Sequence, residues 1–190
     1  PRSTLFPYTT LFRSPVTYVH NVKLTGLKPN TAYGYQILQG AKASPSHTFT
    51  TAALPGTAFR FAWMADCRTQ PEVHDEIAGR IKEMHPRFAL YGGDLCENNG
   101  YEFWKRDFFV PNQLALAAEV PFFYAAGNHE GWSTNTRAFT QAPASASESQ
   151  AYYSFDYGDV HFVCLNNEIS YAPGSPQVDF LVKEIGRAHV

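Results

Sequence analysis

Polar side chains follow three apolar runs of the chain, each at the point where the run ends. Asp66 follows the run FRFAWMA, Asp94 follows FALYGG, and Asn128 and His129 follow VPFFYAAG. Such a run predicts a strand that is buried on both faces. Because the carboxyl ends of parallel strands meet at one edge of a sheet, we expect these four side chains to lie close together.

Two carboxylates, an amide and an imidazole at one sheet edge suit a pair of divalent metal ions. Carboxylate oxygens neutralise the cations, one carboxylate can bridge both, and an Asn carbonyl adds a neutral oxygen ligand. Two ions about 4 Å apart can hold a hydroxide and stabilise both oxygens of an in-line phosphoryl displacement. Each residue taken singly is typical of a cap or a turn, so the prediction depends on the whole set.

A β-α-β-α-β alternation has to position these residues, and it predicts parallel strands with right-handed crossovers. The predicted elements are the strand 59–65, a helix 69–85, the strand 87–93, helices 102–110 and 113–119, and the strand 120–127. A hairpin is predicted over 151–167, with its turn at Gly158–Asp159, and a helix over 175–184.

The first predicted helix has recognisable start signals. Thr69 and Glu72 fit a capping box and Pro71 falls in the first turn. Its expected buried face is formed by Val73, Ile77, Ile81 and Met84. His74 is expected on the helix surface.

Three β-prone runs precede this alternation, at 16–24, 33–37 and 47–51. They are typical of consecutive antiparallel strands of a β-sandwich. The segment LTGLKPNTAY resembles the tyrosine corner of fibronectin type III-like domains, in which the hydroxyl of Tyr33 would bond to upstream backbone. We therefore expect a partial fibronectin-like domain at 15–54 and the N-terminal part of a catalytic domain at 58–184.

The motifs MADCRT, GGDLCE, GNHE and YYSFDYGDVHF together resemble the calcineurin-like metallophosphoesterase superfamily. The preceding β-sandwich run makes the chain similar to the purple acid phosphatase-like branch. The resemblance implies that Asp66 is a ligand of the first metal, that Asp94 bridges both and that Asn128 binds the second. It implies that His129 is no ligand and instead serves the leaving-group oxygen as proton donor or charge stabiliser.

Two positions depart from the family pattern. Glu97 stands where purple acid phosphatases carry the Tyr that ligates ferric iron. The resemblance therefore implies two divalent or mixed-valence metal ions and leaves their identity open among Fe, Zn, Mn and Mg. Arg68 stands where other branches place a His, and it could clamp a phosphate oxygen. Glu97 is either a solvated loop acid or a group that supports the ligands, and both residues are candidates for substrate binding.

The resemblance also implies downstream His ligands, which the chain does not contain: neither His161 nor His189 has the required context. The sequence therefore predicts an incomplete, largely inactive part of a phosphate monoesterase. A phosphodiesterase of the same superfamily, or a non-catalytic binding module on a degenerate phosphoesterase fold, remain alternatives. The family resemblance implies a secreted or periplasmic location.

The composition excludes some classes of function. A net charge of −2 gives no electrostatic footprint for nucleic acid, and no apolar run is long enough to span a bilayer. The three cysteines do not form a disulfide framework. Cys67 and Cys96 match no metal-thiolate spacing, and Cys164 is expected in the core.

Both ends of the chain resemble translated DNA-sequencing adapter. The N-terminal segment PRSTLFPYTTLFRS, residues 1–14, matches the translation of one adapter without a mismatch. The segment IGRAHV at 185–190 matches the translation of the corresponding read-through adapter at the other end. We therefore expect residues 1–14 to pack poorly, and give Arg187 and His189 no functional weight.

Overall fold

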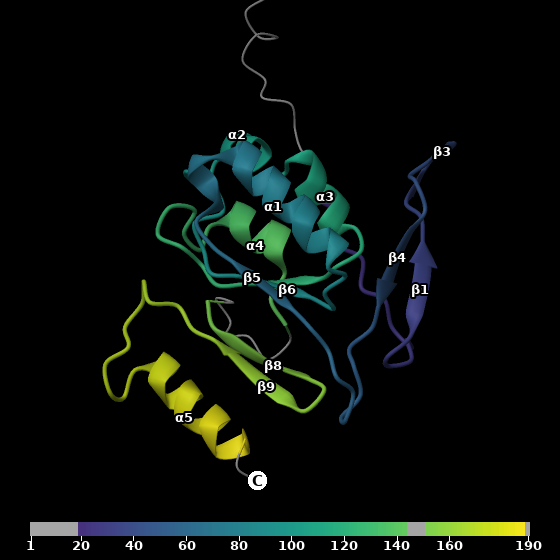
Figure 1. Ribbon diagram of the computed structural model, residues 1–190. Helices are drawn as coiled ribbons and strands as arrows, with labels where there is room; N and C mark the ends of the chain where they lie inside the picture. The colour runs from purple at the N-terminus through teal and green to yellow at the C-terminus, as the bar shows by residue number, and fades with distance from the viewer. Residues whose placement is uncertain (1–18, 144–150, 189–190) are drawn as a thin grey trace, which may run out of the picture.

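The computed structural model describes residues 19–143 and 151–188 (Figure 1). The expectation for residues 1–14 lies outside the described residues, as does that for His189.

A parallel sheet of three strands lies at the centre of the molecule (Figure 1). Its strands are β5 (Ala62–Met64), β6 (Ala89–Tyr91) and β7 (Phe122–Tyr124), in that order. Both pairings are parallel, and the register aligns Trp63 with Leu90 and Leu90 with Phe123. The predicted parallel arrangement is confirmed, although each strand is shorter than the apolar run that encodes it.

Helices cover one face of this sheet (Figure 1). They are α1 (Pro71–Glu83), α2 (Tyr101–Phe103), which continues as the π-helical turn η3 (Trp104–Phe108), and α3 (Pro111–Ala117). A further helix, α4 (Thr134–Thr140), was not predicted, and the Ser133 side chain caps it by accepting from the Thr136 amide. The core between helices and sheet includes the fully buried side chains of Trp104, Phe108 and Leu116.

The hairpin of β8 (Tyr153–Tyr157) and β9 (Val160–Cys164) faces the other side of the sheet, as predicted from its turn. Aromatic rings fill the space between them, and the rings of Phe123 and Phe155 stack at 3.6 Å between centroids. Helix α5 (Pro176–Ala188) packs on the outside of the hairpin. The layers are therefore helices, parallel sheet, hairpin and helix (Figure 1).

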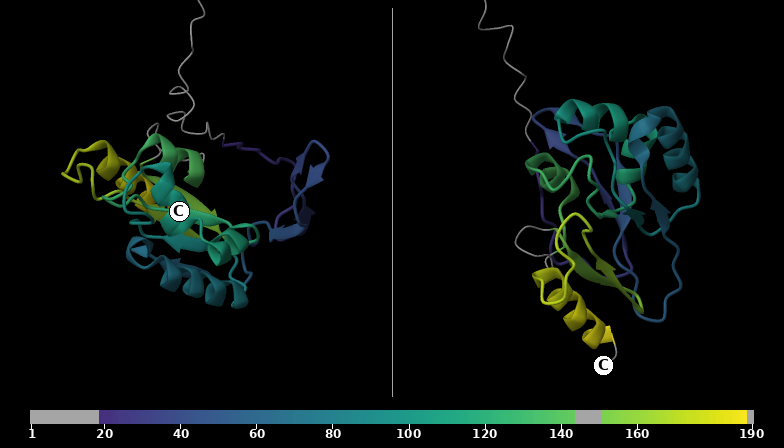
Figure 2. Two further views of the ribbon diagram at one scale, coloured as in Figure 1. Left: turned by 90° about the horizontal axis from the view of Figure 1, so that it is seen from above. Right: turned by 90° about the vertical axis from the view of Figure 1, so that its left-hand side faces the viewer.

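The N-terminal segment stands beside these layers (Figure 2). It contains an antiparallel pair, β1 (Ala32–Tyr35) with β4 (His47–Thr50), and a short pair, β2 (Leu38–Gln39) with β3 (Lys42–Ala43). The Tyr33 hydroxyl accepts from the Lys28 amide at 2.9 Å, which is the bond that a tyrosine corner requires. The strand expected at 16–24 is wrong over residues 19–24, which form no strand. A fibronectin-like domain therefore stays a prediction.

Helix α1 buries a different face from the one predicted. His74, Ala78 and Ile81 are buried, whereas Val73, Ile77 and Met84 are exposed. His74 is only 4% exposed because its ring nitrogens have partners at 2.9 Å and 3.1 Å, the carbonyl of Asp107 and the side-chain oxygen of Gln113. The expectation that His74 lies on the surface is wrong, because η3 and α3 supply buried polar groups that its own helix does not reveal.

Two smaller expectations also fail. Thr69 does not cap α1, which begins after Gln70 and has no side-chain cap. Strand β5 is not buried on both faces, since Trp63 is 73% exposed. The reason is that Trp63 lines an open groove between the sheet and the hairpin, which leaves that face of β5 uncovered.

Candidate metallophosphoesterase site

The three strand ends meet at one edge of the sheet. The Asp66 amide donates to the Gly93 carbonyl at 3.0 Å, and the Arg68 amide donates to the Asp94 carbonyl at 3.2 Å. The His129 amide lies 3.3 Å from Asp94 Oδ1 and donates to it. The three strand-end loops therefore converge on Asp94, and Asn128 is exposed in the same turn as His129. That the four side chains gather around metal ions stays a prediction.

Left-handed backbone turns the chain sharply at both aspartates. Asp66 has φ 56° and Asp94 has φ 55°, values that cost energy for a residue with a side chain. The neighbouring loops approach closely, since a Cβ on Gly93 would lie 2.6 Å from the Gly127 amide nitrogen. A Cβ on Gly127 would in turn collide with the backbone and carboxylate of Asp94. Glycine at these two positions lets the loops carrying Asp94 and His129 touch.

Glu130 fastens those two loops together and was assigned no role from the sequence. Its side chain is fully buried, and its Oε1 accepts from the amides of Asp94 at 3.1 Å and Gly127 at 3.0 Å. The Tyr124 hydroxyl donates to the same oxygen. Burial, followed by the negative charge of Glu130, raises the pKa of Tyr124 well above its ordinary value. The only sequence signal was an acid next to the GNH residues, which does not reveal burial.

Arg68 and Glu97 form an ion pair beside Asp94. Arg68 Nε lies 3.3 Å from Asp94 Oδ2, and its Nη1 lies 3.0 Å from Glu97 Oε2. The hydrogen bond that Arg68 donates to Glu97 is the largest cause that raises the pKa of the Arg68 guanidinium. His129 is close to the same residue, since its Nδ1 lies 3.0 Å from the Glu97 carbonyl and 3.7 Å from Oε1. The two residues that depart from the family pattern thus contact each other.

Asp66, Asp94 and Asn128 provide oxygen donors of the kind that divalent metals prefer, and they lie at one edge of the sheet. They fit a metal in the chemistry of their donor atoms. They do not complete its coordination, because the described residues contain no group of three or more His, Cys, Asp or Glu side chains placed to hold a metal. His161 does not complete it either, since it binds Asp156 at 2.6 Å and Glu184 at 2.9 Å on the outside of the hairpin.

The thiols of Cys67 and Cys96 are protonated in the metal-free chain. Cys67 and Cys96 are buried and free, which agrees with the expectation that no disulfide joins them. Burial is the largest cause that raises the pKa of each thiol to about 12. At neutral pH both are therefore protonated, and a thiol in this form is a poor metal ligand.

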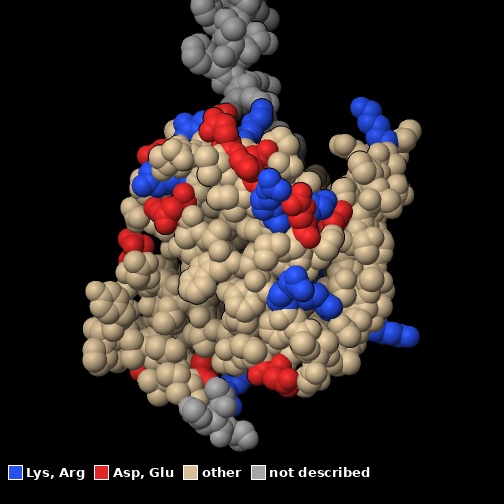
Figure 3. Space-filling view, viewed as in Figure 1, with Lys and Arg blue, Asp and Glu red and all other residues tan. Residues whose placement is uncertain are grey.

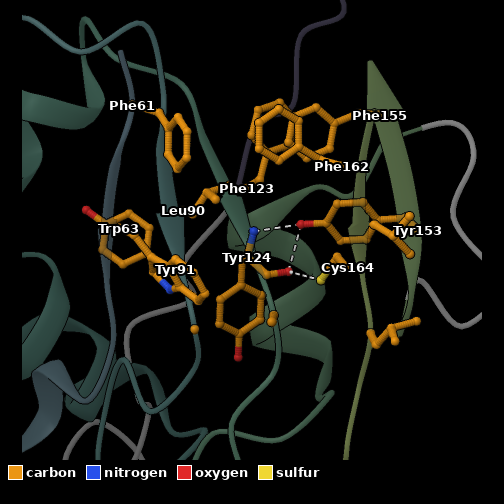
Figure 4. Close-up of a pocket in the computed structure, with 14 residues that line it drawn as sticks. Phe61, Trp63, Leu90, Tyr91, Phe123, Tyr124, Tyr153, Phe155, Phe162 and Cys164 are labelled. Atoms are coloured by element: carbon orange, nitrogen blue, oxygen red, sulfur yellow. Dashed lines mark hydrogen bonds between the residues drawn. The ribbon is translucent and has the colours of Figure 1, made fainter. Parts of the chain in front are cut away.

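A groove lies between the strands β5–β7 and the hairpin, on the face of the sheet that the helices do not cover (Figure 4). This groove has a volume of about 340 Å³ and no charged residue among those that line it. The Tyr153 hydroxyl bonds to both the amide and the carbonyl of Tyr124 at its wall. The groove is therefore apolar, unlike the sheet edge that carries Asp66, Asp94 and Asn128.

Acidic and basic side chains are interspersed on the helix-bearing part of the face seen in Figure 3. That face shows no single basic patch. Within the described ranges, no helix is both long and apolar enough to pass through a membrane. The predicted lack of nucleic-acid binding stays a prediction.

Several known proteins that are similar to the chain are purple acid phosphatases. No protein-family model matches the chain. Purple acid phosphatase 15 of Arabidopsis thaliana is 27% identical to it, over 97% of this chain and 41% of the plant protein. Probable inactive purple acid phosphatase 1 of the same plant is 26% identical, over 86% of this chain and 32% of that protein. The structure of a purple acid phosphatase from yellow lupin seeds superimposes with a TM-score of 0.70, over 86% of this chain and 35% of that one, at 21% identity.

These similarities support the resemblance of the chain to the purple acid phosphatase-like branch of the calcineurin-like metallophosphoesterases. The lupin structure shows the shared fold, an α/β core with the parallel sheet β5–β6–β7. The chain spans less than half the length of the curated relatives that it matches. The purple acid phosphatase-like family implies a dinuclear metal centre.

Proposed function

We propose that the chain is the N-terminal part of the catalytic domain of a dinuclear-metal phosphoesterase that hydrolyses phosphate monoesters. The observation that supports it is the convergence of three strand-end loops on Asp94, in a chain whose relatives are purple acid phosphatases. In this proposal Asp66 and Asn128 each hold one metal and Asp94 bridges both. Bound metals supply Lewis-acid activation of the phosphate and of water. Fe, Zn, Mn and Mg are the candidate ions.

His129 is oriented for work on the leaving group. Because the Glu97 carbonyl oxygen can only accept, Nδ1 of His129 carries the proton in their 3.0 Å bond. This bond orients the ring and leaves Nε2 as the nitrogen that would serve a reacting oxygen. A protonated Nε2 could donate its proton to a leaving alkoxide or stabilise its charge.

The test is hydrolysis of p-nitrophenyl phosphate by the full-length protein that contains this sequence, with Fe, Zn, Mn or Mg supplied in turn. We expect metal-dependent turnover, a loss of at least about a hundredfold on Asp94→Asn, and near-inactivity of the 190-residue chain because its ligand set is partial. No turnover with any of these metals contradicts the proposal. Parallel assay of bis-p-nitrophenyl phosphate separates a monoesterase from a phosphodiesterase. We also propose export from the cytoplasm, supported only by the family resemblance.

One observation favours a second candidate function, a non-catalytic binding module on a degenerate phosphoesterase fold. Asp94 Oδ2, which the hydrolytic proposal assigns to a metal, is paired with Arg68. A protein that lost its metals would retain such an internal counter-ion. Intact His-bearing motifs downstream of Lys183 favour the enzyme, and their loss favours the binding module.

A further inference from the structure

The guanidinium of Arg68 has two carboxylate partners of different kinds. Asp94 belongs to the converging strand ends and its side chain is 15% exposed, whereas the Glu97 side chain is 45% exposed. The two carboxylates contact different nitrogens, Nε and Nη1, so either contact can exist without the other. Arg68 can therefore leave one partner and keep the second.

The contact with Asp94 competes with any cation that binds there. A divalent ion at Asp94 Oδ2 must displace Nε of Arg68, because both would need the same oxygen and both are positive. Displacement of an unsupported guanidinium from a partly buried carboxylate would be costly. Glu97 reduces that cost because it still binds Nη1 after Nε has left.

The surrounding contacts keep this arrangement in place. The Arg68 amide is hydrogen-bonded to the Asp94 carbonyl, which ties the backbone of the two residues together at 3.2 Å. The Glu97 amide donates to Asp107 Oδ2 at 2.9 Å, and Asp107 is fully buried. The backbones of Arg68 and Glu97 are therefore each hydrogen-bonded in place, so the guanidinium can change partner without a change in either hydrogen bond.

We propose that Arg68 is a built-in counter-ion of Asp94 that a metal ion has to displace, and that Glu97 is the alternative partner that receives it. This inference rests on the proposed function, because it concerns the same carboxylate. Arg68 thereby lowers the metal affinity of the site, and Glu97 restores part of it. Arg68 and Glu97, the two departures from the family pattern, therefore act as one pair. When Asp94 holds a metal, Glu97 keeps the guanidinium of Arg68 beside the site.

The experiment is calorimetric titration of Mn²⁺ into the 190-residue chain and its variants, so the readout is binding and not turnover. Asp94→Asn identifies the heat that comes from this site. We expect Arg68→Met, which keeps the length of the side chain and removes its charge, to raise Mn²⁺ affinity about fivefold to tenfold. Arg80→Met on α1 is the matched control, since it makes the same charge change beside exposed partners only.

A double-mutant cycle tests the role of Glu97. We expect Glu97→Gln alone to lower Mn²⁺ affinity about threefold, and to have no effect in the Arg68→Met background. An equal loss in both backgrounds would mean that Glu97 acts as an independent charge, and a larger loss without Arg68 would mean that it ligates the metal. Either result overturns the pairing.

The remaining outcomes are also decisive. Unchanged or lower affinity in Arg68→Met overturns the counter-ion role, as does the absence of Asp94-dependent Mn²⁺ binding in both the parent chain and Arg68→Met. Failure of the proposed function looks different, because the full-length protein would then bind Mn²⁺ through Asp94 without hydrolysing phosphate esters.

Discussion

The two faces of the parallel sheet bury different kinds of side chain. Under the helices, polar groups such as His74, Gln113 and Glu130 are buried and bonded to partners. Under the hairpin, the buried cluster is mainly aromatic, with Phe88 and Tyr157 at its centre. Directional bonds fix loop positions, whereas aromatic packing supplies stability with fewer directional demands. The loops of the candidate site are held by directional bonds of this kind, since Glu130 accepts from the amides of Asp94 and Gly127.

The largest effect should come from the hairpin face. Phe88 is fully buried and packs against six other aromatic rings, including Phe123 and Phe162, so Phe88→Ala should lower the free energy of unfolding by about 3–5 kcal/mol. Urea unfolding followed by fluorescence measures it. Phe61→Ala is the matched control, with a smaller expected loss because Phe61 is partly exposed. Equal losses would mean that the groove is packed as tightly as the cluster.

On the helix-covered face, Glu130→Ala should cost about 2 kcal/mol, because it leaves the Asp94 and Gly127 amides and the Tyr124 hydroxyl without their acceptor. Glu130→Gln retains an acceptor oxygen and should recover much of that loss. Urea unfolding measures the stability, and amide exchange at Asp94 reports whether the loop itself has loosened. If Glu130→Ala left this exchange unchanged, Glu130 would not position the loop.

The smallest effect concerns the thiols of the two faces. Burial is the main cause that raises the pKa of Cys96 to about 12 and that of Cys164 to about 11. At pH 8 we expect iodoacetamide to modify the native chain far more slowly than the unfolded one. Cys164 should react first, since it lines the open groove while Cys96 is fully buried. Peptide mass spectrometry gives the order, and faster modification of Cys96 would contradict the comparison.

These pKa shifts also set a direction for stability against pH. A thiol whose pKa is raised on folding binds its proton more tightly in the folded state, so its contribution is complete below about pH 9, the ordinary thiol value. That contribution falls as the pH rises from about 9 toward 12. Cys96→Ala should flatten this alkaline decline in urea unfolding, and an unchanged slope would contradict the assignment to Cys96.

Local sequence determined much of this architecture. The alternation of apolar runs and amphipathic stretches predicted the parallel strands β5, β6 and β7, and Gly158–Asp159 predicted the hairpin turn. The polar residues at strand ends predicted that Asp66, Asp94 and His129 would meet, because parallel strands share one carboxyl edge. Such predictions succeed because strand direction and turn chemistry depend on residues that are close in sequence.

Tertiary structure alone decided which groups are buried and which charges meet. Periodicity placed Val73 and Ile77 in the core, but the buried face of α1 was selected by η3 and α3, which bring partners for His74. Glu130 became a central anchor, and Arg68 found Glu97, through contacts between separate strand-end loops. The physical reason is that burial and ion pairing depend on neighbours from distant segments of the chain. The hydrophobic pattern within one segment does not specify those neighbours.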